Sequence, residues 1–132
     1  MGQQRFCQML PGERWSYVAM RVRCALHPNE PKVIEQVFAM GIWLHDKGEF
    51  SAWDVARRTA VLLLDTAQDE ALPWHWRRLC LDQSPRPLAV MHQICQMNSV
   101  APHEASEYRR CLQCLSRRAA RIDMGRGYHA PP

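Results

Sequence analysis

Two helix-start signals stand on either side of an aliphatic run in EFSAWDVARRTAVLLLDTAQDEAL, residues 49–72. Ser51 is followed three residues later by Asp54, and Asp65 by Gln68, so the spacing of a capping box occurs twice. The run between them, AVLLL, is too short for another element and too apolar for a solvent-exposed loop. A tight turn that buries these side chains between two helices would satisfy both signals. The segment therefore predicts a helix-turn-helix at about 51–72, with the chain reversing at 61–64.

Most of the remaining chain is also predicted to be helical. Apolar residues recur at helical spacing over 32–46, and Gly48 suits the left-handed position that ends such a helix. Further helices are expected at about 88–97 and at 103–123. The longest of them carries one apolar stripe, formed by Ala105, Tyr108, Leu112, Leu115, Ala119 and Ile122.

Two segments give other or ambiguous signals. Over 15–26 the apolar residues alternate with polar or small ones, a period of two that favours a strand, although a short helix is an alternative. Residues 74–81 fit a strand by their aromatics and a helix by their arginines, and 82–87 is predicted to be a loop. The expected fold is mostly α: a single helical domain built on the helix-turn-helix, with a short N-terminal strand or a small wing as an option. Its expected organisation is a flexible arm at 1–13, the domain at 14–124 and a flexible tail at 125–132.

Composition is that of one ordinary globular domain. The 132 residues are 47% hydrophobic and 23% charged, and no apolar stretch approaches the roughly 18 residues of a membrane span. The N-terminal sequence MGQQRFCQML lacks the pattern of an export signal, so we expect a cytoplasmic protein without a membrane partner. The six cysteines are then expected to be reduced thiols rather than disulfides.

Charge is distributed unevenly along the chain. Residues 1–73 carry 8 basic and 9 acidic groups, a net of −1, whereas residues 74–132 carry 9 and 4, a net of +5. An electropositive C-terminal half favours an anionic partner, but arginine-rich solvated surface is an equally good interpretation.

The predicted helix-turn-helix suggests how DNA would be bound. A recognition helix enters the major groove with its first residues at the base edges, while flanking arginines neutralise phosphates. Thr66 and Gln68 are the candidates for base contacts. The candidates for phosphate contacts are Arg57, Arg58, Arg77 and Arg78.

The stretch FAMGIWLHDKGEFSAWDVARRT resembles the helix-to-helix core of the CaiF/GrlA family of bacterial transcriptional activators. The shared features are an apolar helix with Trp43, a turn with Gly48, and then Phe50, Ser51, Asp54, Val55 and Ala56. The resemblance covers about residues 34–72. It implies activation of a bacterial operon by binding promoter DNA, without an enzymatic step.

A second pattern has metal-site spacing. His92 and Cys95, and then Cys111 and Cys114, form two pairs with two intervening residues each, which is typical of tetrahedral zinc ligands. Cysteines on a helix flank are also common packing residues, so zinc and core packing are both open interpretations. No cofactor is otherwise indicated.

No catalytic motif is present, and we expect a protein that is not an enzyme. The main functional prediction is a transcriptional regulator that binds double-stranded DNA. The alternative is a small helical adaptor or anti-regulator that binds another protein, without DNA and with zinc as an optional stabiliser. The long helix at 103–123 could serve core packing or a homodimer.

Overall fold

Helices account for nearly all of the chain that the structure describes. The structure, a computed structural model, describes residues 10–97 and 100–128, with side chains placed as far as residue 117. Its helices, in chain order, are α2 (Pro11–Arg23), α3 (Lys32–Asp46), α4 (Ala52–Gln68), α5 (Trp74–Gln83), α6 (Pro85–Gln96) and α7 (Pro102–Tyr128). The described residues contain no strand and form a single helical domain, which confirms the predicted mostly α class.

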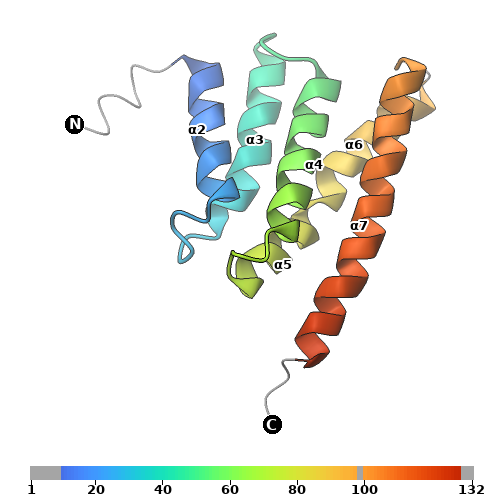
Figure 1. The fold of residues 1–132 in the computed structure, drawn as a ribbon. Helices are drawn as coiled ribbons and strands as arrows, with labels where there is room; N and C mark the ends of the chain where they lie inside the picture. Colours follow the sequence, from blue (N-terminus) through green and yellow to red (C-terminus); the bar gives the residue numbers. More distant parts are fainter. Residues whose placement is uncertain (1–9, 98–99, 129–132) are drawn as a thin grey trace.

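The helices are arranged around α4. Helices α2, α3 and α4 stand side by side with alternating direction, α5 and α6 lie behind α4, and α7 runs beside α4 in the same direction (Figure 1). Helix α4 contacts each of the other described helices. The 27 residues of α7 span about 40 Å at 1.5 Å per residue, and its last turns extend past the other helices (Figure 1).

The predicted helix-turn-helix is wrong, because α4 runs without interruption from Ala52 to Gln68. The first start signal is real: the Ser51 hydroxyl accepts a hydrogen bond from the Asp54 amide at 3.1 Å. The second is not, since Asp65 lies exposed within the helix. No glycine or proline interrupts this stretch, and one continuous face of it is buried. That face includes Ala56, Ala60, Leu63, Leu64 and Ala67. The aliphatic run therefore packs as part of a long helix instead of filling a turn.

The predicted strand at 15–26 is also wrong, because α2 occupies this segment. Trp15, Val18 and Val22 are buried at steps of three and four, whereas Met20 of the alternating pattern is 47% exposed. The Trp15 indole nitrogen donates to the Val37 carbonyl at 2.9 Å, which fixes α2 against α3.

Helix α3 matches the predicted bounds and ends as predicted. Gly48 has φ of +79°, and the amides of Gly48 and Glu49 bond to the carbonyls of His45 and Leu44, which is a Schellman ending. Helix α2 ends with the same bonds, but its left-handed residue is Ala25, with φ of +48°.

The later helices are longer than predicted. The ambiguous segment at 74–81 belongs to α5, and the predicted loop at 82–87 is mostly helical because Pro85 occupies the first turn of α6, where proline is tolerated. Helix α2 begins within the predicted arm and α7 extends into the predicted tail, so both boundaries shift outward. Residues 1–9 and 129–132 of those two segments lie outside the described part.

Candidate functional site

The two side chains predicted to read DNA bases are held within the domain. Thr66 is fully buried, and its hydroxyl donates to the Leu62 carbonyl at 2.7 Å. The Gln68 side-chain nitrogen donates to the sulfur of Cys114 on α7 at 3.1 Å. Neither side chain stands on a free helix that could enter a groove of DNA, so the predicted base contacts are wrong as placed.

The predicted phosphate contacts are dispersed. The Arg58 guanidinium lies over the rings of Trp15 and Phe50, at 5.8 and 5.0 Å from their centroids. Arg77 donates from Nε to the Ala67 carbonyl at 2.9 Å. Arg78 pairs with Asp82 at 3.1 Å, four residues along α5. Arg57 lines a recess of the surface, and Arg58 lines a smaller one between α2, α3 and α4.

The predicted zinc ligands do not form one site. Within the described part of the chain, no three His, Cys, Asp or Glu side chains are grouped so that they could hold a metal ion. His92 is exposed on α6, with Tyr108 beside its ring at 5.7 Å and the Gln96 amide at 3.2 Å. Cys95 and Cys111 pack against the apolar side chains between α6 and α7. The packing interpretation of these cysteines thus accounts for their positions.

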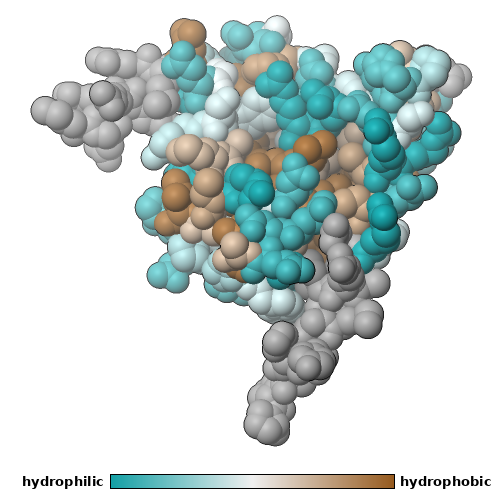
Figure 2. Space-filling model, in the orientation of Figure 1, coloured by the Kyte–Doolittle hydropathy of each residue, from teal (hydrophilic) through white to brown (hydrophobic). Residues whose placement is uncertain are grey.

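The recess that Arg57 lines is a groove between α4 and α7, with a volume of about 270 Å³. Its apolar floor is formed by Val61 and Leu64 from α4 and by the two thiols of Cys111 and Cys114 from α7. The Gln68–Cys114 hydrogen bond crosses one end of it. Apolar side chains are visible between α4 and α7, with hydrophilic ones on both sides (Figure 2).

Four charged side chains line the groove beside this floor. Helix α4 contributes Arg57 and Asp65, and helix α7 contributes Glu107 and Arg110. The ion pairs of the described side chains lie elsewhere: Arg21–Glu30, Arg23–Asp69 and Arg78–Asp82. The four groove charges therefore make no ion pair within 4.0 Å to any described side chain.

The Cys111 thiol of the groove is suited to packing more than to reaction. Burial raises the pKa of the Cys111 thiol, and the neighbouring Cys114 and Glu107 raise it further. A protonated thiol is a poor nucleophile and a poor metal ligand. The sequence predicts the Cys111–Cys114 pair as a metal motif, but a turn at 61–64 would not bring the α4 side chains beside it.

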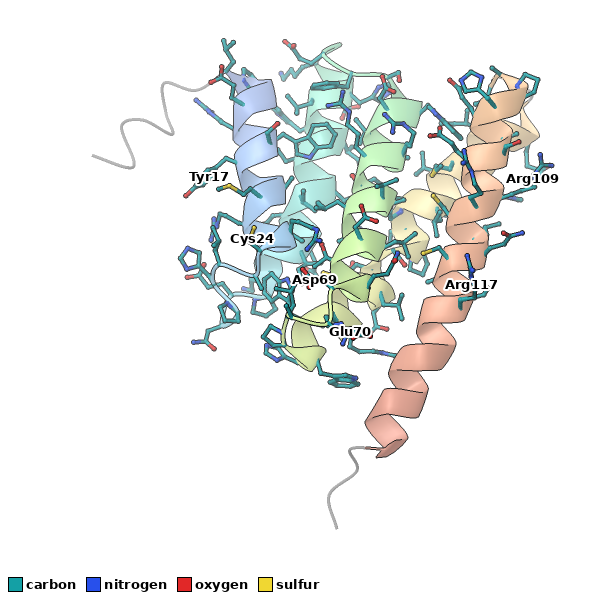
Figure 3. All side chains as sticks on the ribbon, viewed as in Figure 1. Tyr17, Cys24, Asp69, Glu70, Arg109 and Arg117 are labelled. Atoms are coloured by element: carbon teal, nitrogen blue, oxygen red, sulfur yellow. The ribbon has the colours of Figure 1, made fainter. Side chains whose placement is uncertain are left out.

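The rest of α7 presents a basic surface. Arg109, Arg110 and Arg117 are exposed, and Figure 3 shows Arg109 on the side of α7 that faces away from α4. The side chains of Arg118, Arg121 and Arg126, as well as Ala119 and Ile122 of the predicted stripe, lie outside the described side chains. Within the described stripe, Leu115 and Tyr108 pack into the domain while Leu112 is 36% exposed.

None of the described helices is long and apolar enough to cross a membrane. No protein-family model matches the chain, and no curated protein and no solved structure matches it either. The resemblance to the CaiF/GrlA activators stays a prediction.

Proposed function

We propose that this protein is a small helical interaction module that binds a helix of another protein in the groove between α4 and α7. The observation that supports this best is the pairing of an apolar floor with four charged side chains that make no ion pair to another described side chain. Grooves that receive amphipathic helices combine apolar pockets for anchor side chains with a polar rim.

The size of the groove favours a protein partner over a small molecule. Cofactor and drug-sized ligands occupy pockets of about 300–1,000 Å³ that enclose most of the ligand. A groove of about 270 Å³ that is partly open to solvent is better suited to one or two anchor side chains of a helix. The raised pKa of the Cys111 thiol likewise favours binding over nucleophilic catalysis.

Site-specific photocrosslinking tests this proposal. A photoreactive amino acid is introduced at Val61 on the groove floor and, as a matched control, at Ala39 on the exposed face of α3. In the cells that make the protein, we expect a discrete crosslinked protein from position 61 and none from position 39. Equal crosslinking from both positions, or none from position 61, would overturn the proposal.

DNA binding is the second candidate, and it is favoured by the charge of the C-terminal half. Residues 74–132 carry a net charge of +5, and the exposed Arg109, Arg110 and Arg117 lie along one helix. Binding through such arginines would be electrostatic, so affinity for random duplex DNA would fall steeply with added salt. A regulator of the kind that the CaiF/GrlA resemblance implies would then meet DNA with α7 instead of with residues 66–72.

One double variant separates the two candidates. Arg109→Glu combined with Arg117→Glu should abolish retention of duplex DNA at low salt if DNA is the partner. The same variant should leave the crosslink from position 61 unchanged if the groove binds a protein, because Arg109 and Arg117 do not line the groove.

A further inference from the structure

The positions of the four groove charges along α4 and α7 follow from one contact. The Gln68–Cys114 hydrogen bond fixes which residues of α4 and α7 lie beside each other along the helix axes. The two helices run in the same direction (Figure 1). At 1.5 Å per residue, Asp65 lies about 4.5 Å and Arg110 about 6 Å from that contact, so these two side chains are at nearly the same level.

The other two charges lie nearer the start of both helices. By the same rise, Glu107 is about 10 Å and Arg57 about 16 Å from the Gln68–Cys114 contact. Along α4 the order from the start of the groove is therefore a cation and then an anion. Along α7 it is an anion and then a cation.

These opposite charges do not neutralise each other across the groove. Asp65 and Arg110 stand level but make no ion pair in the described structure, since the ion pairs there involve other residues. Rim charges held apart beside an apolar floor are available to a third helix lying between them. Charges of a complementary helix would meet opposite charges on both flanks, and charges of a mismatched helix would meet like charges.

We infer that the occupant of the groove is an amphipathic partner helix whose two flanks carry charges in the mirrored order. Its flank against α4 would place an acidic residue beside Arg57 and a basic residue beside Asp65. Its flank against α7 would place a basic residue beside Glu107 and an acidic residue beside Arg110. This inference rests on the proposed function and adds the charge pattern of the partner.

The spacing of the pattern follows from the groove. Arg57 and Asp65 are eight residues apart on α4, so the acidic and basic residues of that flank should be about seven or eight residues apart on the partner. Glu107 and Arg110 are three residues apart on α7, so the other flank should carry its basic and acidic residues three or four apart. An apolar stripe between the flanks would rest on Val61 and Leu64.

Designed peptides provide the test, with the full-length protein as the receptor. One peptide has the mirrored charge order around a leucine stripe, and its control exchanges every acidic and basic residue while keeping the same stripe and the same net charge. Each peptide is also synthesised with its sequence reversed, so that both orientations in the groove are tested. We expect the mirrored peptide to bind about tenfold more tightly at low salt, with the difference shrinking as salt screens the rim charges.

A charge-exchanged receptor provides the second readout. The double variant Arg57→Glu and Asp65→Arg keeps the net charge and changes residues that are not in the buried core. It should abolish the preference between the two peptides, because each peptide then meets opposite charges on one flank and like charges on the other. Circular dichroism checks that the helical content of the variant is retained.

The outcomes distinguish the inference from the proposed function. If both peptides bind equally, the groove receives helices but the charge inference is overturned. If neither binds, the groove is not a helix site and the proposed function falls with it. If the protein instead self-associates and Val61→Asp makes it monomeric, the occupant is a second copy of this chain and the inference of a mirrored partner is overturned.

Discussion

The side-chain nitrogen of Gln68 donates a hydrogen bond to the sulfur of Cys114, 46 residues further along the chain, at 3.1 Å. This contact joins the end of α4 to the middle of α7 and closes one end of the groove. Gln68 therefore holds two helices together, in a position where the sequence had suggested a base-reading side chain.

Replacement of Gln68 by alanine should loosen α7. A lost side-chain hydrogen bond costs about 0.5–1.5 kcal/mol, so we expect the free energy of unfolding to fall by about 1 kcal/mol. Hydrogen exchange of α7 amides near Cys114 should become faster in the same variant. Gln113→Ala, on the exposed side of α7, is the matched control and should change neither quantity. Equal effects of the two variants would contradict this role for Gln68.

Gly41 allows α2, α3 and α4 to approach one another. A Cβ atom at this position would lie 2.7 Å from Cγ1 of Val55 and 3.0 Å from Cζ2 of Trp15. Alanine has the higher helix propensity by about 1 kcal/mol, but overpacking a core costs about 1–3 kcal/mol. Gly41→Ala should therefore lower the midpoint of urea unfolding. Combining it with Val55→Ala should cost less than the sum of the two single variants, and strict additivity would argue against the clash.

The two Schellman endings should respond in opposite directions to exchange of alanine and glycine. Gly48→Ala places a side chain at φ of +79° and should destabilise the protein by about 1 kcal/mol. Ala25→Gly removes the side chain that is strained at φ of +48° and should stabilise the protein. The gain should be at most about 1 kcal/mol, because glycine also raises the conformational entropy of the unfolded chain. Thermal unfolding of both variants measures this, and shifts of the same sign would contradict the explanation.

The ion pair between Arg23 and Asp69 should make the protein sensitive to acid. The hydrogen bond from Arg23, at 2.8 Å, lowers the pKa of Asp69 below its ordinary value of 3.8, with help from the Ala71 amide. Because the folded pKa is the lower one, the stabilisation is present above pH 3.8 and is lost as the pH falls through the folded value. Asp69 and Cys24 mark the neighbouring ends of α4 and α2 in Figure 3.

Asp69→Asn tests this linkage, because the amide keeps an oxygen to accept the Ala71 hydrogen bond. The variant should unfold more easily at neutral pH and lose less stability than the wild type between neutral pH and pH 3. Glu35→Gln removes an exposed carboxylate of α3 and should retain the acid dependence of the wild type. Chemical denaturation over this pH range is the measurement, and parallel profiles for all three proteins would refute the assignment.

Cys80 should be inert in the folded protein. It is fully buried, and desolvation raises the pKa of its thiol to about 12. Maleimide labelling at mild alkaline pH, followed by peptide mass spectrometry, should modify the exposed Cys24 first and Cys80 only at the rate of global unfolding. Because the folded pKa is above the ordinary 9.0, stability should also decline as the pH rises above that value. Equal labelling rates for the two thiols would contradict the burial of Cys80.

The class of fold could be predicted from the sequence, but the course of α4 could not. The bounds of α3, its glycine ending and the Ser51 cap are local features, and local residues decide them. Whether the aliphatic run at 60–64 bends or continues is decided by what packs against it. Leu63 and Leu64 are buried among side chains from helices far away in sequence, which no local pattern reveals.

The candidate groove was hidden for the same reason. The sequence spacing predicts the two thiols as a pair. The α4 side chains of the groove share a face only if α4 is one continuous helix, and these are Arg57, Val61, Leu64 and Asp65. The strand predicted at 15–26 failed similarly. Val18 and Val22 fit both an alternating and a helical pattern, and the Trp15 contact with α3 decides between them.

The central position of α4 has a consequence for how the chain can be divided. Since every other described helix rests against α4, removal of this helix would leave the others without a common surface. If the chain is cut within α4, neither fragment should fold stably by itself. The whole domain should therefore fold in one cooperative transition, without an independently stable subdomain. Substitutions at Ala60, in the middle of its buried face, should therefore slow folding more than they accelerate unfolding.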